Sequence, residues 1–219
     1  MSDAETEQYN WQRKMIGVMV ILLTPLSVLF GLFGYATNPP EWWYSISSTY
    51  YANSKAIMIS IITIAAFFFC TYKGYDWKDR VVNLMSGIGL ALLLVFPCKG
   101  GYTEQASNLF NVPVSVSGAI HNVSAIIAFI GFFFNVGFLF TKSSGIMTDR
   151  KKIRNIIYRA SALCVIPGAF IIILLGNILE GTPHALCVNY VWWAELLALV
   201  PCGVSWLVKA GVFKFLNDK

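Results

Sequence analysis

The chain has 219 residues, of which 57% are hydrophobic and only 12% are charged. Ordinary soluble domains are roughly 45–50% apolar and about 25% charged, so this composition excludes a typical soluble globular protein. The formal net charge of +5 does not indicate a nucleic-acid partner, because the basic residues lie between long apolar spans. Anionic lipid headgroups and membrane topology account for basic residues in such positions. We therefore expect membrane lipids, and no nucleic acid, as partners.

Six apolar spans follow one another along the chain, and they predict an all-α integral membrane protein with six transmembrane helices. A helix of about 20 residues rises roughly 30 Å, which matches the hydrocarbon core of a bilayer. The second and third spans are the shortest. The predicted spans are residues 15–35, 56–72, 81–97, 118–141, 160–179 and 191–208.

The basic residues predict the orientation of these spans. Threading the spans alternately leaves only Lys55 and Lys99, of the 16 Lys and Arg residues, on the side opposite both termini. Cytoplasmic loops carry the excess of Lys and Arg. We therefore predict that both termini are cytoplasmic, in a plasma membrane of the bacterial inner-membrane type. The predicted organisation is a cytoplasmic N-terminal segment 1–14, a six-helix transmembrane domain 15–208 and a cytoplasmic C-terminal tail 209–219.

Two inner segments carry helix signals of their own. Asp76 and Asp79 precede or begin the third span and are predicted to cap its N-terminus. The basic run at 149–155 predicts an interfacial helix that continues into the fifth span. Pro167 and Pro201 lie inside the fifth and sixth spans, where each removes one helix hydrogen bond.

The first outer segment, residues 36–55, combines aromatic rings with hydroxyl side chains. Rings such as those of Tyr50 and Tyr51 favour the membrane interface, and an aromatic belt accounts for most of them. A belt does not account for the run of hydroxyl residues that includes Ser47 and Ser48. These four side chains would alternatively form a lid over a pocket at the mouth of the bundle, and both interpretations stay open.

Ionisable and polar residues near the outer ends of the spans are the best indication of a site, because charge inside a membrane is costly. His121 lies early in the fourth span, Glu195 lies early in the sixth, and Glu180 ends the fifth. Asn122 lies at a similar depth. One hypothesis is a structural polar network that holds the helices in register. The other is an outward-facing pocket in which His121 and Glu195 contact a ligand or move a proton.

The sequence indicates no metal site and no cofactor. The chain has two histidines, whereas a catalytic zinc usually takes three protein ligands, and no nucleotide-binding loop or serine-nucleophile motif occurs. An enzyme is the less favoured interpretation; if the protein is one, we expect a membrane-embedded, lipid-modifying enzyme. Cys98 and Cys187 share the predicted outer side, where an oxidising environment permits a disulfide between them.

Four short features carry a resemblance to a known family: a Pro-Glu pair, an Ile-Ser pair in a serine-rich segment, a histidine early in the fourth span and an acidic residue early in the sixth. They are Pro40-Glu41, Ser45-Ile46-Ser47, His121 and Glu195. The layout is similar to that of the FRAG/DRAM/Sfk superfamily of six-span membrane proteins, although there the Pro-Glu pair usually follows the Ile-Ser pair. The resemblance implies roles in lipid-anchor remodelling, autophagy or membrane homeostasis. The chain also looks like small bacterial six-span proteins that end in a Ser-Trp-Leu-Val-Lys stretch, here residues 205–209.

The function predicted from these features is binding of a lipid or small amphiphile in an outward-facing polar pocket. His121 and Glu195 would form its polar centre, with residues of the 36–55 segment as a lid. Two alternatives stay open. The protein could be a non-catalytic membrane effector or scaffold that acts by self-assembly as a homo-oligomer or by binding a partner, or it could be a transporter or pore.

Overall fold

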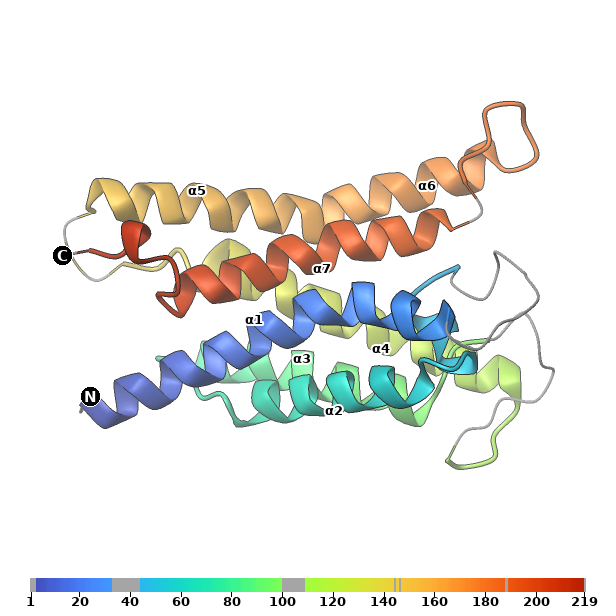
Figure 1. Ribbon diagram of the computed structural model, residues 1–219, viewed down its shortest axis with the longest axis horizontal. Helices are drawn as coiled ribbons and strands as arrows, with labels where there is room; N and C mark the ends of the chain where they lie inside the picture. The colour runs from blue at the N-terminus through green and yellow to red at the C-terminus, as the bar shows by residue number, and fades with distance from the viewer. Residues whose placement is uncertain are drawn as a thin grey trace.

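The computed structural model describes residues 3–32, 44–99, 109–143, 145, 147–187 and 189–218 (Figure 1). Over these ranges the chain is helical and contains no β-strand, which confirms the predicted all-α class. The helices are α1 (Asp3–Leu32), α2 (Lys55–Thr71), α3 (Trp77–Val95), α4 (Val114–Phe134), α5 (Asp149–Leu163), α6 (Ala169–Leu179) and α7 (Tyr190–Lys209).

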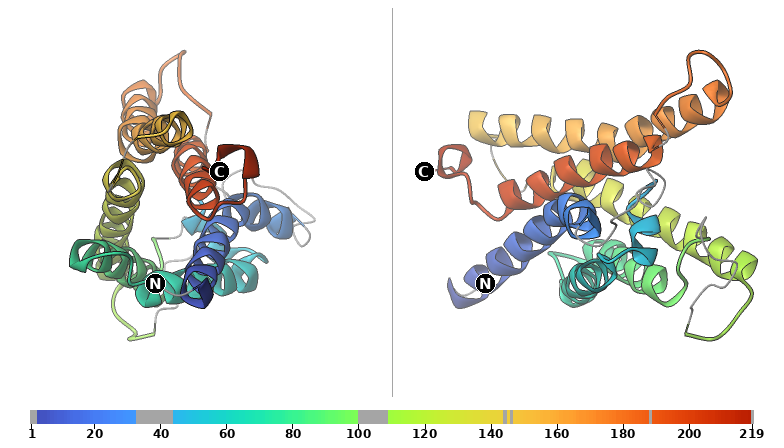
Figure 2. Two further views of the ribbon diagram at one scale, coloured as in Figure 1. Left: turned by 90° about the vertical axis from the view of Figure 1, so that its left-hand side faces the viewer. Right: turned by 45° about the vertical axis from the view of Figure 1, so that its right-hand side comes forward.

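The helices form an elongated bundle in which successive rods run in alternating directions (Figure 1). Helix α1 packs against α2 and α7, and α3 packs between α2 and α4. Helices α5 and α6 form one long rod that packs against α7, as the turned views also show (Figure 2). Both ends of the chain lie at the same end of the bundle, and the described residues 44–54, which lead into α2, lie at the opposite end (Figure 1).

Four rods are long and apolar enough to cross a membrane, and they support a membrane protein: Glu5–Leu32, Val114–Leu139, Asp149–Leu179 and Tyr190–Lys209. Helix α2 is apolar but has only 17 residues. Helix α3 has 19 residues, and its first turn carries Lys78, Asp79 and Arg80, which make it less apolar. The two helices outside the set of four therefore correspond to the two shortest predicted spans.

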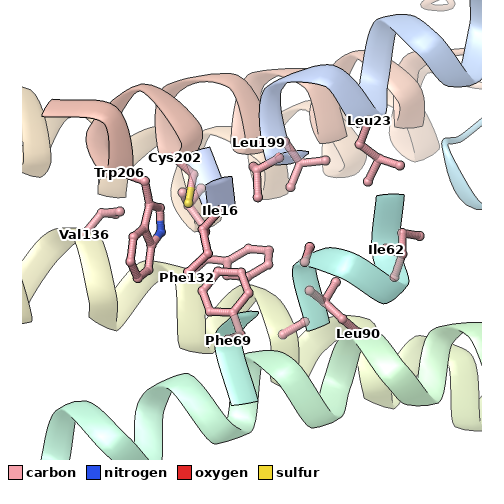
Figure 3. Close-up of a cluster of buried hydrophobic side chains, with 14 of the residues drawn as sticks. Ile16, Leu23, Ile62, Phe69, Leu90, Phe132, Val136, Leu199, Cys202 and Trp206 are labelled. Atoms are coloured by element: carbon pink, nitrogen blue, oxygen red, sulfur yellow. The ribbon is translucent and has the colours of Figure 1, made fainter. Parts of the chain in front are cut away.

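Aromatic and aliphatic side chains fill the centre of the bundle (Figure 3). Trp206 of α7 is fully buried, and its ring lies 5.3 Å from that of Phe69 of α2 and 4.8 Å from that of Phe140, centroid to centroid. Phe69 in turn stacks on Phe132 of α4 at 5.2 Å. These contacts join α2, α4 and α7 across the centre of the bundle.

The two prolines predicted to disturb helices are accommodated within continuous rods. Pro167 lies in a π-helical segment, Cys164–Gly168, which joins α5 to α6. A π-helical turn is one of the usual ways in which a helix absorbs a local irregularity. Pro201 lies inside α7, which continues to Lys209. The rod Asp149–Leu179 also confirms that the basic run begins a helix that continues into the fifth predicted span.

The start of α3 was predicted from the sequence, whereas the start of α1 was not. Asp76 caps α3, because its side chain accepts a hydrogen bond from the Asp79 N–H at 3.0 Å. Asp79 accepts one from the Tyr75 N–H at 2.8 Å, so the predicted capping is confirmed. Helix α1 begins at Asp3, and the predicted N-terminal segment 1–14 is therefore largely an extension of the first helix.

Candidate functional site

The segment before α2 lies across the bundle end opposite the termini and carries the serines singled out in the sequence. Ser45 and Ser48 bond reciprocally: the Ser45 N–H donates to Ser48 Oγ at 2.9 Å, and the Ser48 N–H donates to Ser45 Oγ at 3.0 Å. The Trp192 N–H at the start of α7 donates to the Tyr44 carbonyl at 3.0 Å. Side chains and backbone together fix this segment against α7.

Glu195 of α7 also holds this segment in place. Its Oε2 accepts a hydrogen bond from the Ile46 N–H at 2.5 Å. Ile46 precedes a short 3-10 helix, Ser47–Tyr51, so its N–H has no partner in a preceding turn. The side-chain oxygen of Glu195 therefore supplies an acceptor that the local backbone lacks.

His121 of α4 is 3% exposed and connects the segment to the end of α3. Its Nδ1 lies 2.9 Å from the Phe96 carbonyl oxygen, and its Nε2 lies 2.9 Å from Ser47 Oγ. A carbonyl oxygen only accepts, so in the neutral ring Nδ1 carries the proton. Nε2 is then an acceptor, and the Ser47 hydroxyl donates to it.

Three consecutive carbonyls after α3 are held by side chains from other elements. His121 binds the Phe96 carbonyl, and Ser117 donates to the Pro97 carbonyl at 2.9 Å. The Tyr51 hydroxyl donates to the Cys98 carbonyl at 2.6 Å. Burial raises the pKa of Tyr51 to about 12, so this hydroxyl remains a donor throughout the physiological range. The cluster thus satisfies backbone groups that a helix end leaves unpaired.

The structure brings together only part of the predicted set. Ser47, Ser48, Tyr51, His121 and Glu195 belong to the network described above. We call these five side chains, with Ser45, the outer polar cluster, because they lie at the bundle end opposite the termini (Figure 1), which the sequence predicts to face outward. They come from the segment before α2, from α4 and from α7, so their association depends on the fold; the sequence indicated only that they lie at a similar depth.

The other predicted residues lie at its edge or outside it. Tyr50 is buried, and Lys55 Nζ lies 4.4 Å from the centre of its ring. Asn122 is exposed although it follows His121, because successive helical residues point about 100° apart. Glu180 is exposed as well. Over the residues described, no hydrogen bond joins Asn122 or Glu180 to the outer polar cluster, and a role for either in ligand binding stays a prediction.

Cys98 and Cys187 carry free thiols in the structure, and a disulfide between them in an oxidising environment stays a prediction. Burial raises the pKa of the Cys98 thiol to about 12, which keeps it protonated and unreactive. No group of three or more His, Cys, Asp or Glu side chains gathers to hold a metal ion among the residues described. Glu41, which carries part of the family resemblance, lies outside the described residues.

Sequence reasoning missed a second polar region at the end of the bundle that holds the termini. A cavity of about 730 Å³ opens there. Membrane topology alone accounts for the basic residues that line this cavity. The only signal in the sequence that could have brought them together is that alternate threading of the spans places all of them on the same side. The charged and aromatic lining residues are Arg13, Tyr75, Lys142, Lys151, Arg154, Tyr158, Lys209 and Asp218.

Comparison with protein-family models, with curated proteins and with solved structures finds no match to this chain.

Proposed function

We propose that this is a six-span membrane protein, with both termini in the cytoplasm, whose outer polar cluster binds a lipid or a small amphiphile. Four rods have the length and hydropathy of spanning helices. Helices α2 and α3, with 17 and 19 residues, reach roughly 26–28 Å at 1.5 Å per residue, which is close to the hydrocarbon thickness. Both pack between longer rods, so the bundle would cross the bilayer as one unit.

The observation that carries the binding proposal is the Ser47–His121 hydrogen bond. His121 is buried, whereas Ser47 is half-exposed, so Ser47 is the member of this pair that reaches the surface. The neighbouring Tyr51 and Ser48 are half-exposed too. A hydroxyl, a ring and an adjacent apolar bundle suit a ligand that has a polar head and an apolar body. The FRAG/DRAM/Sfk resemblance, which includes Ser47 and His121, favours a lipid.

Native mass spectrometry of the detergent-purified full chain tests this proposal. We expect the wild type to retain a lipid or amphiphile, and Ser47→Ala to lose most of it. Ser60→Ala is the matched control, since Ser60 Oγ donates to the Ala56 carbonyl on the exposed side of α2. His121→Ala/Glu195→Ala should lose the ligand completely. Retention equal to wild type in both Ser47→Ala and the double variant, with the fold intact, would overturn the proposal.

A second candidate function is lipid modification by acyl transfer, and the geometry of His121 favours it. Nδ1–H of this ring is oriented by the Phe96 carbonyl, and Nε2 faces the Ser47 hydroxyl at 2.9 Å. A base held by a third group and hydrogen-bonded to a hydroxyl is the arrangement that activates a nucleophile. Ser47 Oγ would attack an ester carbonyl carbon while its proton passes to His121 Nε2.

The rest of that reaction balances without a cofactor. The ester C–O bond breaks, and the leaving alcohol takes the proton from His121 Nε2. Water then attacks the carbonyl carbon of the acyl-serine and gives one proton to His121 Nε2. Ser47 Oγ leaves and takes that proton, and a carboxylic acid is released. A fluorophosphonate probe tests this candidate, because it phosphonylates an activated serine and releases fluoride. We expect labelling of Ser47 in the wild type and none in His121→Ala. An unlabelled wild type would leave ligand binding without catalysis as the function.

The same mass spectra separate the two remaining alternatives. A scaffold predicts a defined homo-oligomer whose mass persists in Ser47→Ala, with no ligand dependent on the outer polar cluster. A transporter or pore predicts flux across liposomes that contain the purified protein. Retention of a ligand by a monomer, without flux, would favour the binding function over both.

A further inference from the structure

The cavity at the termini end is lined by cations from helices far apart in sequence. Arg13 comes from α1, Lys151 from α5 and Lys209 from the last turn of α7. Tyr75, in the turn before α3, completes this part of the wall. The three cations are separated along the chain but converge in the fold, and we call them the cation cluster.

Arg13 is 5% exposed, and its guanidinium is bonded only to neutral groups in the part of the chain described. Nε donates to the Tyr72 hydroxyl at 2.8 Å, Nη1 to Asn10 Oδ1 at 2.9 Å, and Nη2 to the Tyr75 hydroxyl at 2.9 Å. Buried charges in proteins are usually paired with an opposite charge. These three bonds orient the guanidinium but do not neutralise it.

Lys209 and Lys151 lie around the same aromatic rings. Arg13 Cζ and Lys209 Nζ lie 5.4 Å and 5.3 Å from the centre of the Tyr75 ring. Lys209 Nζ also lies 5.5 Å from the centre of the Phe140 ring, and Lys151 Nζ donates to the Phe140 carbonyl at 2.9 Å. The ring faces and one carbonyl partly stabilise these charges. The cations still repel one another, because like charges this close interact through a partly dry medium.

The nearby carboxylates are held by other cations. Lys142 Nζ lies 2.8 Å from Asp76 Oδ2 and 3.0 Å from Asp79 Oδ1. Arg154 Nη2 lies 2.6 Å from Asp218 Oδ2. Over the described ranges, no ion pair joins the cation cluster to a carboxylate. The cavity is therefore lined by three cationic side chains, none of which forms an ion pair with a described carboxylate, although Asp79 and Asp218 act on Lys209 and Lys151 at longer range.

We propose that the cation cluster binds the phosphate group of an organic phosphomonoester in this cavity. Such a group carries about −1.5 to −2 charges at pH 7 and three strong acceptor oxygens, which suit three converging cations. An arginine fork can bind two phosphate oxygens, whereas each lysine acts as a point charge.

The dimensions of the cavity favour an organic phosphate over a bare anion. A volume of about 730 Å³ falls within the roughly 300–1,000 Å³ of small-molecule pockets. Rings of Tyr75 and Tyr158 supply apolar wall for the remainder of the ligand. The phosphomonoester could belong to a lipid headgroup, such as phosphatidic acid, or to a soluble metabolite. The inference does not depend on ligand binding at the outer polar cluster.

Two binding measurements on delipidated full-length protein in detergent distinguish these sources. In the lipid arm, native mass spectrometry compares retention of added phosphatidic acid with that of phosphatidylcholine. In the soluble arm, calorimetry measures binding of glycerol 3-phosphate, with inorganic phosphate as the smaller probe. We expect selective binding of a phosphomonoester in one of the two arms, and the arm in which it appears identifies the source.

The variants assign that binding to the cluster. Lys151→Gln/Lys209→Gln should weaken it at least about tenfold, which corresponds to about 1.4 kcal/mol. Lys152→Gln is the matched control, because Lys152 is adjacent in sequence, its side chain is 59% exposed and it pairs with Asp149 outside the cavity. It should bind within about twofold of wild type. Arg13→Lys keeps the positive charge but loses the guanidinium fork, and it should show an intermediate loss of affinity. If the double variant does not fold, this variant tests whether the cation cluster binds the phosphate.

Two results would overturn this inference. One is a wild type that binds phosphatidic acid no more strongly than phosphatidylcholine and glycerol 3-phosphate no more strongly than inorganic phosphate. The other is a Lys152→Gln loss as large as that of the double variant, which would indicate diffuse attraction rather than a site. Ser47→Ala should leave phosphate binding unchanged, so failure here is distinguishable from failure at the outer polar cluster.

Discussion

The polar side chains at the two ends of the bundle differ in whether the protein itself supplies their partners. At the outer end, His121 and Glu195 each have partners within the protein, and their bonds satisfy backbone groups at element ends. At the termini end, Arg13 and Lys209 face neutral oxygens and aromatic rings. The first arrangement stabilises the fold by itself. The second leaves like charges close together, which is favourable only when an anion is bound.

This difference predicts opposite signs for mutations at the two ends. Removing a side chain from the outer polar cluster strands a partner and should destabilise the protein. Removing a charge from the cation cluster should stabilise the ligand-free protein while it weakens binding. A stability series on delipidated protein therefore tests the comparison directly, before either ligand is known.

The largest expected effect is that of His121→Ala. It leaves the Phe96 carbonyl and the Ser47 hydroxyl without their partner and creates a cavity, and we expect a loss of about 2–4 kcal/mol in the free energy of unfolding. Denaturant titration in detergent, followed by helical circular dichroism, measures it. Asn122→Ala, at the adjacent exposed position, should change stability by less than about 0.5 kcal/mol. Equal effects of the two variants would show that the network contributes little.

Glu195→Ala should have the next largest effect. It leaves the Ile46 N–H without its acceptor, and the cost of stranding such a donor is about 1–3 kcal/mol. Glu195→Gln keeps a carbonyl oxygen at the same position and should recover most of that loss. The same titration measures both variants. If glutamine were as damaging as alanine, the charge of Glu195, and not its acceptor oxygen, would be what the segment requires.

Lys209→Met should have a smaller effect of the opposite sign. Methionine keeps the unbranched chain that packs near Tyr75 and Phe140 but removes one of the clustered charges. We expect delipidated Lys209→Met to be more stable than wild type by about 0.5–1 kcal/mol, and the gain to shrink at high salt as repulsion is screened. Destabilisation that does not depend on salt would mean that the lysine is already neutralised.

The helices were predictable from sequence because their causes are local. Hydropathy located the rods, and Asp76 marks the start of α3 because a capping carboxylate acts within one turn. The length of α1 was not predicted, because residues 5–14 are polar and hydropathy does not report a helix that extends beyond the apolar span.

The sites were less predictable because their causes are long-range. Depth alone brought His121 and Glu195 together with Asn122 and Glu180. Helix rotation separates Asn122 from the cluster, and Glu180 is exposed just after the end of α6. The cation cluster joins the start of α1 to the end of α7, and no spacing in the sequence indicates that these meet at one ring. Membrane topology already explains why these residues are basic, so the sequence offers no separate reason to propose that they bind a ligand.

The smallest expected effect concerns Asp76, which with Asp79 keeps Lys142 out of the cation cluster. Hydrogen bonding to Lys142 lowers the pKa of Asp76 from its ordinary 3.8. The resulting stability is present above that value and is lost as the pH falls through the lowered pKa. Burial alone would lower the pKa of Lys142, but its bonds to the two aspartates outweigh burial and raise it.

Asp76→Asn isolates this contribution, because asparagine still caps α3 but does not pair with Lys142. Thermal melting at pH 7 and at pH 3 should show a larger drop for wild type than for the variant. At pH 7 the variant should also bind a phosphomonoester slightly more tightly, because Lys142, which lines the cavity wall, then pairs with one carboxylate instead of two. Asp79 limits that gain by keeping its own bond to Lys142. Weaker binding by Asp76→Asn would indicate that Lys142 acts through its fixed position beside Asp76 rather than through its charge.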